Sequence, residues 1–256
     1  MLTATIPNDS VIVTSEGSAK IVKVLCLHGK GGDGSSFKKT LSSLEATLAE
    51  RSDGKKIRFE FDYVTAPFPM ESESKSVGRN GNNDKRGAQW WRLPPGIRSF
   101  DADEYIGFDE SERIVTDYLH YDLFFGHSQG AILLAALFAR SSGIKQNSRK
   151  KPLGCILNGV AWPNPFSSHL EAMMHENASS STTTDICNVP LFPKALFVIG
   201  ESDEMNPPEG AIRVREAIKK CNVAVETVSH SGGHSVPVGD SIAMERISTW
   251  IMQVVR

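Results

Sequence analysis

The chain has 256 residues, of which 40% are hydrophobic and 23% charged, and its formal net charge is -2 at pH 7. This length and composition suit one sizeable α/β domain over residues 1–256. The near-neutral charge argues against binding of nucleic acid or of anionic membranes, because both favour basic patches. We expect the partner to be a small molecule, and the sequence carries no pattern typical of a subunit contact.

The sequence predicts a soluble, cytoplasmic protein with no stable membrane insertion. Residues 1–9 lack a basic region followed by an apolar stretch, and no uncharged run approaches the ~20 residues that cross a bilayer. The cysteines form no C-x-x-C pair, and two of them lie in apolar runs where a thiol behaves as a small hydrophobe. We expect all four to be reduced and structural: Cys26, Cys155, Cys187 and Cys221.

Strand and helix patterns alternate along the chain. In chain order, the expected elements are a strand at 21–27, a helix at 35–50, a strand at 57–64, a helix at 109–119, strands at 123–125, 153–157 and 195–199, a helix at 207–220, a strand at 223–228 and a helix after residue 240. Several strands are apolar almost throughout, as in parallel strands that helices cover on both faces. The pattern predicts a doubly wound, mostly parallel sheet flanked by helices, which is the α/β class.

Apolar spacing predicts the buried face of each helix, and polar residues predict two of the helix starts. The helix at 109–119 has Asp109 and Glu112 in positions typical of a capping box, and Asp240 is placed to cap the final helix. The residues that we expect the helices to bury are Phe37, Leu41, Leu44 and Leu48 in the first, Ile212, Val214 and Ile218 in the third, and Ile242, Ile247, Trp250, Ile251 and Val254 in the last.

Two polar stretches interrupt this regular alternation. Residues 71–87 are dense in Ser, Asn, Gly and charge, and residues 167–188 include a run of three serines and three threonines. Neither composition buries much apolar surface. We interpret both as surface insertions within a single domain, because strand patterns resume on either side of each.

A G-x-S-x-G motif, Gly126-His127-Ser128-Gln129-Gly130, lies between a strand pattern and a helix pattern. This context defines a nucleophile elbow, in which Ser128 occupies a sharp, strained turn. The flanking glycines allow the strand and helix backbones to close around it. The pentad alone is weak evidence, so the prediction of a nucleophile depends on its neighbours.

A serine nucleophile needs an imidazole base and an orienting carboxylate, which follow it in the order acid then histidine in this fold. His169 and His175 fall in a polar insertion, whereas His230 ends a strand. His234 follows a flexible Ser-Gly-Gly turn and is the base that we prefer. The preferred acid is Asp203, which stands beyond the carboxyl end of a strand, where such sheets place their sites. Glu201 and Glu204 are its rivals on the same turn.

The reaction also needs two amide donors for the developing oxyanion. Gln129 N–H supplies one, and Lys30 N–H, in the glycine-rich loop after the first strand, is the natural second donor. A glycine-rich loop of this kind also suits phosphate binding. However, no G-K-[ST] follows and the spacing is not G-x-G-x-x-G, so we disfavour a nucleotide site.

Six segments together resemble the FSH family of serine hydrolases, within the α/β-hydrolase superfamily and related to the ovarian-cancer-associated esterase. The segments are 25–29 (LCLHG), 89–91 (QWW), 105–111 (YIGFDES), 126–131 (GHSQGA), 200–204 (GESDE) and 231–237 (SGGHSVP). The Gly-Gly-His-x-Val-Pro segment and the Trp-Trp pair are specific, whereas the elbow alone matches almost any α/β-hydrolase. The resemblance covers most of the chain.

The resemblance implies hydrolysis of carboxylic esters or thioesters with Ser128 as nucleophile, Asp203 as acid and His234 as base, and it requires no metal or other cofactor. The family usually has Phe where His127 stands and an aromatic or bulky apolar residue where Lys30 stands. The rival functions are a thioesterase or lysophospholipase with the same residues, and a noncatalytic small-molecule receptor on the same fold.

Trp90 and Trp91 form the Trp-Trp pair of this resemblance. Their large, rigid indole faces suit the lining of an acyl groove. Packing in the core is an equal alternative for both side chains.

Overall fold

The computed structural model describes residues 18–70, 87–140, 150–175 and 190–256. Its centre is a six-stranded sheet in the order β2-β1-β5-β6-β7-β8, in which every neighbouring pair is parallel. The strands are β1 (Lys20–Leu27), β2 (Ile57–Val64), β5 (Leu123–His127), β6 (Gly154–Asn158), β7 (Lys194–Gly200) and β8 (Ala224–His230). The predicted doubly wound parallel sheet is confirmed, with each strand within a few residues of its expected position.

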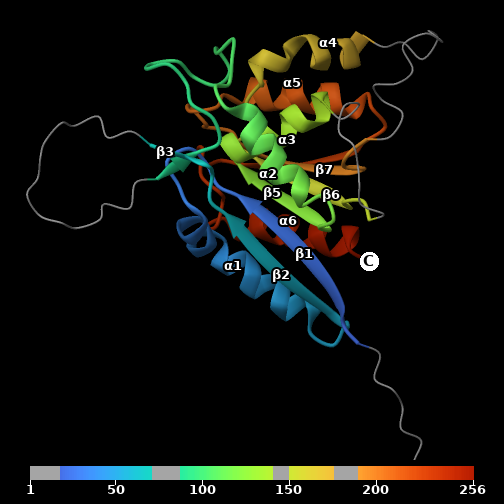
Figure 1. Cartoon of the computed structure of the whole chain (residues 1–256). Coiled ribbons are helices and arrows are strands. Elements are labelled where there is room, and N and C mark those ends of the chain that lie inside the picture. Colours follow the sequence, from blue (N-terminus) through green and yellow to red (C-terminus); the bar gives the residue numbers. More distant parts are fainter. Residues whose placement is uncertain (1–17, 71–86, 141–149, 176–189) are drawn as a thin grey trace, which may run out of the picture.

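Helices cover both faces of this sheet (Figure 1). One face carries α1 (Gly34–Ser52) and α6 (Ser241–Val254), and the other carries α2 (Phe108–Asp117), α3 (Gln129–Ala139), α4 (Ser167–His175) and α5 (Pro208–Lys219). A short turn, η2 (Asn164–Phe166), precedes α4, and a two-stranded antiparallel ribbon pairs β3 (Phe68–Pro69) with β4 (Ala88–Gln89). The alternation of strand and helix in the sequence is therefore the alternation of the layers.

Each strand divides its side chains between two hydrophobic cores. In β1, Leu25 and Leu27 join the core beneath α2 to α5, whereas Val24 and Cys26 join the core beneath α1 and α6. Successive side chains of a strand point to opposite faces, so a strand buried on both sides is apolar at nearly every position. This is the physical reason for the continuous apolar runs in the sequence.

The helix predictions are confirmed in most respects and wrong in three. Asp240 caps α6 as expected, its Oδ1 accepting from Ala243 N at 2.9 Å. By contrast, α2 begins after Gly107, which provides no side-chain cap, and both Asp109 and Glu112 instead pair with Arg140 at the end of α3. The other two errors are apolar side chains that turn out of the core, at Ile212 (41% exposed) and Ile242 (73% exposed).

The first part of the second polar insertion is helical. It forms α4, which buries Leu170 and Met173 against the main core. The prediction that this stretch buries little apolar surface is therefore wrong for residues 167–175, because two apolar side chains three positions apart suffice to dock one helical face. The rest of this insertion, and residues 71–86 of the first, lie outside the described residues.

The expectation for the cysteines also needs one correction. Cys26 and Cys155 are buried free thiols, as predicted, and burial raises the pKa of both. Cys221, after the end of α5, is disulfide-bonded, so it is not reduced. Cysteine spacing alone does not reveal such a bond, because tertiary structure decides which cysteines approach each other. Cys187 lies outside the described residues.

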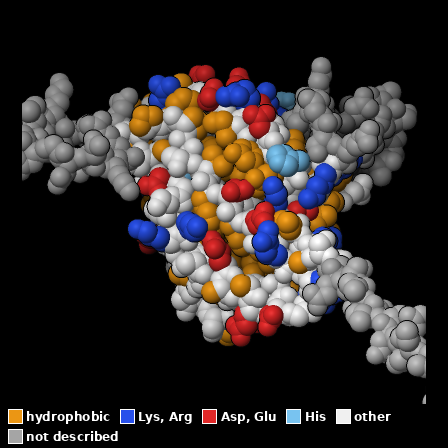
Figure 2. Space-filling view, turned by 60° about the horizontal axis from the view of Figure 1, so that its bottom comes forward, with side chains coloured by type: hydrophobic (Ala, Val, Ile, Leu, Met, Phe, Trp, Pro, Cys, Tyr) orange, Lys and Arg blue, Asp and Glu red, His pale blue; other side chains and the backbone are white. Residues whose placement is uncertain are grey.

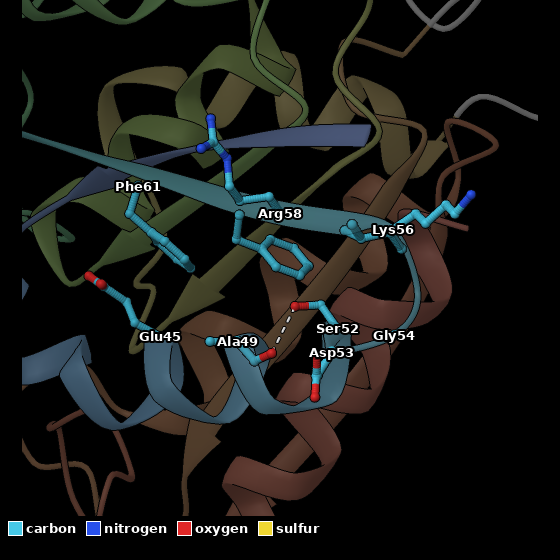
Figure 3. Close-up of a pocket in the computed structure, with 10 residues that line it drawn as sticks. Glu45, Ala49, Ser52, Asp53, Gly54, Lys56, Arg58 and Phe61 are labelled. Atoms are coloured by element: carbon cyan, nitrogen blue, oxygen red, sulfur yellow. Dashed lines mark hydrogen bonds between the residues drawn. The ribbon is translucent and has the colours of Figure 1, made fainter. Parts of the chain in front are cut away.

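Among the described residues, no helix is both long enough and apolar enough to cross a membrane. Figure 2 turns the lower side of the molecule forward and shows Lys and Arg interspersed with Asp and Glu across that face. A hollow of about 500 Å³ lies between the end of α1 and the start of β2 (Figure 3). It is at the amino end of the strand, whereas parallel sheets of this type place their ligands at the carboxyl ends.

Candidate active site

Ser128 lies at the carboxyl end of β5, on the turn into α3. Its backbone has φ 53° and ψ -117°, a strained conformation for a residue with a side chain. A Cβ atom on Gly126 would come within 2.7 Å of the Ala131 backbone, and one on Gly130 within 2.4 Å of the Leu27 carbonyl. The strand, turn and helix of a nucleophile elbow are therefore present, and both flanking positions require glycine.

Asp203 and His234 meet at the same edge of the sheet. Asp203 follows β7 and His234 follows the neighbouring β8, and His234 Nδ1 donates to Asp203 Oδ2 at 2.7 Å. The Asp203 side chain is only 2% exposed, and its Oδ1 accepts from the backbone N–H groups of Met205 and Asn206, both at 2.9 Å. Because Nδ1 is hydrogen-bonded to the carboxylate, Nε2 is the ring nitrogen through which His234 can contact a further partner.

The rival acids and bases lie in different surroundings. Glu201 and Glu204 are exposed on the turn that carries Asp203. His230 is buried at the end of β8, where burial lowers its pKa. His169 is exposed on α4, and the side chain of His175 lies outside the described residues.

Gly29 and His127 lie between Ser128 and the His234 ring and contact one or the other. A Cβ atom on Gly29, in the loop after β1, would lie 3.0 Å from the Ser128 Cβ and 3.1 Å from the His127 ring. The His127 ring lies 5.1 Å from the His234 ring, centroid to centroid. A Cβ atom on Gly159, after β6, would lie 3.1 Å from the His234 ring. The structure thus gathers the ends of five strands around one small region.

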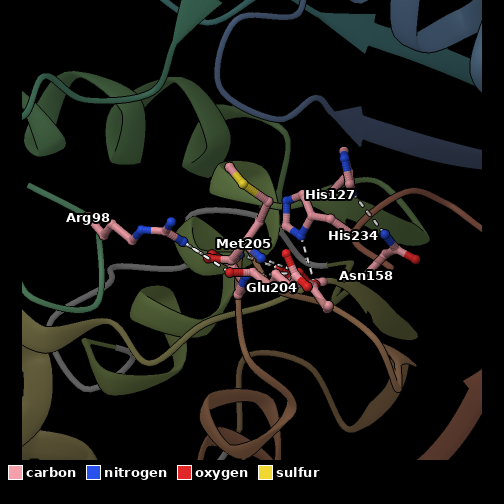
Figure 4. Close-up of polar contacts among 9 residues, drawn as sticks. Arg98, His127, Asn158, Glu204, Met205 and His234 are labelled. Carbon is pink, nitrogen blue, oxygen red and sulfur yellow. Dashed lines mark hydrogen bonds and ion pairs between the residues drawn. The ribbon is translucent and has the colours of Figure 1, made fainter. Parts of the chain in front are cut away.

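His127 and Asn158 are part of this region although no sequence pattern assigns them a role. They stand opposite each other in the register of β5 and β6, and their side chains are joined by a hydrogen bond of 2.8 Å between His127 Nδ1 and Asn158 Nδ2 (Figure 4). Burial, with the nearby His234 as the second cause, lowers the pKa of His127 to about 3. His127 is therefore a neutral imidazole packed against His234 at ordinary pH.

Among the described residues, neither of the two expected oxyanion donors has an acceptor for its N–H group. Gln129 is the first residue of α3, so its N–H has no acceptor within the helix. In the loop after β1, Gly31 N donates to Ala88 O at 2.8 Å and Gly32 N to Gly29 O at 3.1 Å. Lys30 N makes no hydrogen bond to any of the described residues, which leaves it available to a ligand.

Trp90 and Trp91 are fully buried, which corresponds to core packing and not to an exposed groove lining. Trp90 Nε1 donates to the His28 carbonyl at 2.8 Å, and the Trp91 ring stacks on Tyr105 at 4.2 Å. The Gln129 side chain holds the pair, because its Oε1 accepts from Trp90 N at 2.8 Å and its Nε2 donates to Trp91 O at 3.2 Å. The Trp90 indole thus holds the loop after β1, and the backbone of the pair is tied to the elbow through Gln129.

Two further side chains hold the turn that carries Asp203. Arg98 Nη1 donates to the carbonyls of Met205 at 2.8 Å and Glu204 at 3.2 Å (Figure 4). Asn206 Nδ2 donates to the Gly159 carbonyl at 2.6 Å. Neither was identified from the sequence, because both act from loops whose contacts depend on the folded arrangement.

The fold and the elbow define an α/β-hydrolase. Solved structures of this fold include SOBER1 of Arabidopsis thaliana (TM-score 0.59, 16% identity, 92% of this chain and 100% of that chain) and acyl-protein thioesterase 2 of Zea mays (TM-score 0.60, 16% identity, 94% and 96%). The family model described as serine hydrolase (FSH1) matches residues 18–245. The chain therefore belongs to the FSH1 family of serine hydrolases, as the resemblance implied.

Curated relatives of the chain are esterases and a hydrolase. Esterase OVCA2 of Danio rerio is 26% identical over 241 residues, covering 88% of this chain and 94% of the relative. Esterase AGAP003155 of Anopheles gambiae is 28% identical over 242 residues, covering 90% and 77%. Hydrolase phiM of Talaromyces stipitatus is 27% identical over 221 residues, covering 84% and 81%. Family and relatives together support a general hydrolase function.

Proposed function

We propose that this chain hydrolyses carboxylic esters of small molecules, with short- to long-chain acyl groups, through an acyl-enzyme. Ser128 Oγ attacks the acyl carbonyl while His234 Nε2 takes its proton. His234 then gives that proton to the leaving alcohol as the acyl carbon–oxygen bond breaks. Water attacks the acyl-enzyme with the same base, releasing the acid and restoring Ser128. No step calls for a metal or an organic cofactor.

Asp203 and two backbone amides complete the proposed machinery. Asp203 holds His234 in the tautomer that carries its proton on Nδ1 and stabilises the imidazolium that forms during the reaction. The N–H groups of Gln129 and Lys30 stabilise the oxyanion. The observation that carries this proposal is the 2.7 Å hydrogen bond between His234 and Asp203, made at the sheet edge where Ser128 occupies its strained turn.

The decisive test is the Ser128→Ala variant, assayed with p-nitrophenyl esters and with a fluorophosphonate probe. We expect the wild-type chain to hydrolyse the ester and to be labelled, and the variant to lose both properties while its circular dichroism is unchanged. Ser42→Ala, at an exposed position of α1, is the matched control and should behave as the wild type. Activity of the Ser128→Ala variant at the wild-type level would end the proposal.

The same proteins and assays distinguish the proposed esterase from the rival functions. A noncatalytic receptor on this fold would neither turn over an ester nor react with the fluorophosphonate at Ser128. Parallel assays with oxygen esters and thioesters of the same acyl chain assign the leaving group, because the acyl-enzyme is the same for both. A clear preference for thioesters would replace the esterase with a thioesterase of the same mechanism.

A further inference from the structure

A pocket of about 290 Å³ lies beside the turn that carries Asp203. Three segments form its walls: the loop before α2, the connection from β6 to α4, and the start of α5. Its main lining residues are Phe100, Ala161, Trp162, Pro207, Gly210 and Arg213. Its volume is near the lower end of the range for small-molecule sites, about 300–1,000 Å³, which suits one chain or one ring.

The pocket adjoins the proposed catalytic residues through two of its walls. Gly159, which packs against the His234 ring, is two residues before Ala161. Asn206, which donates to the Gly159 carbonyl and whose N–H binds Asp203, directly precedes Pro207. In the sheet order, β6 and β7 are on the opposite side of β5 from β1, so the pocket and the Lys30 loop flank Ser128 on opposite sides.

Three polar side chains around this pocket, those of Trp162, Asn164 and Arg213, already have partners, and a fourth, Glu209, is exposed. Trp162 Nε1 donates to Ser167 Oγ at 2.7 Å, and Asn164 Nδ2 donates to the Ala102 carbonyl at 3.1 Å. The Arg213 guanidinium lies 3.7 Å from the centre of the Trp162 ring and pairs with Glu171 at 2.5 Å. Away from the exposed Glu209, a polar ligand group would have to displace one of these contacts, whereas an apolar group would displace none of them.

We infer that this pocket binds the apolar chain of the ester substrate and sets the chain length that the enzyme prefers. The inference rests on the proposed function and extends it by naming an unbranched apolar chain as the group recognised. Such a chain belongs either to the acyl group or to the leaving alcohol. Two series of esters distinguish these sources: p-nitrophenyl esters from acetyl to decanoyl, and acetate esters from ethyl to decyl.

Ala161→Leu adds three carbon atoms to the wall and should exclude about three methylenes of a bound chain. Each excluded methylene costs about fourfold in affinity, so kcat/KM for the longest ester of one series should fall about fifty-fold. The acetyl p-nitrophenyl ester should stay within about twofold of the wild type. Phe100→Ala widens the pocket and should shift the preference toward longer chains. Opposite shifts from the two variants cannot arise from general damage to the fold.

Ala224→Leu is the matched control, because it makes the same chemical change at an exposed position at the start of β8. It should leave both ester series unchanged. An equal loss over all chain lengths in the Ala161→Leu variant, or no loss in either series, would overturn the inference.

Calorimetric titration with 1-decanol measures ligand binding to the pocket in the absence of ester hydrolysis. We expect Ser128→Ala to bind 1-decanol, and the double variant with Ala161→Leu to bind it at least tenfold more weakly. Binding that does not change with Ala161→Leu would contradict the pocket assignment. If the wild type hydrolyses no ester but 1-decanol binding still depends on Ala161, the proposed function fails and the pocket remains.

Discussion

Asn206 connects the turn that carries Asp203 to the loop that packs against His234. Its side chain donates to the Gly159 carbonyl at 2.6 Å, while its own N–H donates to Asp203 Oδ1 at 2.9 Å. One residue thus fixes the spacing between the carboxylate and the backbone beside the imidazole. The hydrogen bond of His234 to Asp203 depends on this spacing, since neither ring nor carboxylate is held by its own strand alone.

Replacement of Asn206 by Ala should therefore affect turnover more than stability. The lost hydrogen bond should lower the free energy of unfolding by about 1 kcal/mol. The freed turn should lower kcat by about tenfold or more, because small misplacements of catalytic groups are costly. Urea unfolding and steady-state kinetics measure the two effects. Glu204→Ala, an exposed change on the same turn, should alter neither, and wild-type kcat in the Asn206→Ala variant would refute the positioning role.

Asp203→Asn should reduce kcat by about four orders of magnitude with little effect on folding. The backbone N–H groups of Met205 and Asn206 will hold the amide oxygen where Oδ1 now lies, so the NH₂ group will face His234 Nδ1. His234 must then carry its proton on Nε2, and it cannot accept the serine proton. Glu201→Gln and Glu204→Gln are the matched controls and should retain activity. A larger loss in either control would reassign the acid.

The regular elements of the fold were predictable because their signals are local. The sequence predicts the strand at 57–64 with its observed bounds and Asp240 as the cap of the last helix. The capping prediction for Asp109 failed because α2 begins earlier, after Gly107, so that Asp109 lies inside the first turn and its side chain pairs with Arg140. Local patterns show neither this shift of the helix start nor the long-range contact.

The candidate site was predictable only where sequence order implies neighbouring strand ends. Asp203 follows the carboxyl end of a strand and His234 follows a flexible turn after the next strand in the chain, and the structure shows that these strands, β7 and β8, are neighbours. The contact of His127 with Asn158 depends instead on the register of β5 and β6, and the sequence does not specify that register. The backbone of Trp90 and Trp91 is held by the Gln129 side chain, a role that no motif indicates.

Gln129→Ala separates the role of this side chain from that of its backbone amide. The change leaves the buried N–H of Trp90 and the carbonyl of Trp91 without their partner, so the free energy of unfolding should fall by about 2–4 kcal/mol. The N–H of residue 129 remains, so kcat of the folded fraction at low temperature should stay within about tenfold of the wild type. Gln253→Ala, exposed on α6, should change stability by less than about 0.5 kcal/mol. Equal stability of the two variants would exclude this role of the Gln129 side chain.

His127 should make the stability of the protein fall as the pH is lowered. Its pKa is about 3 in the folded chain and 6.5 in its ordinary range, so below about pH 6.5 the unfolded chain binds a proton that the folded chain does not. Its contribution is therefore complete above pH 6.5 and is lost toward pH 3, by up to about 1.4 kcal/mol per pH unit. Burial also lowers the pKa of His28 and His230, which adds to the same trend.

His127→Phe isolates this contribution, since a phenyl ring fills the same space and does not titrate. Between pH 7 and pH 5 the wild type should lose about 2 kcal/mol more of its unfolding free energy than the variant, as measured by urea unfolding. The comparison uses the change in the free energy of unfolding with pH in each protein. A cost of breaking the hydrogen bond to Asn158 that is the same at every pH therefore cancels. The other two histidines are common to both proteins and cancel as well. Parallel pH profiles for the two proteins would show that His127 is not kept neutral by the fold.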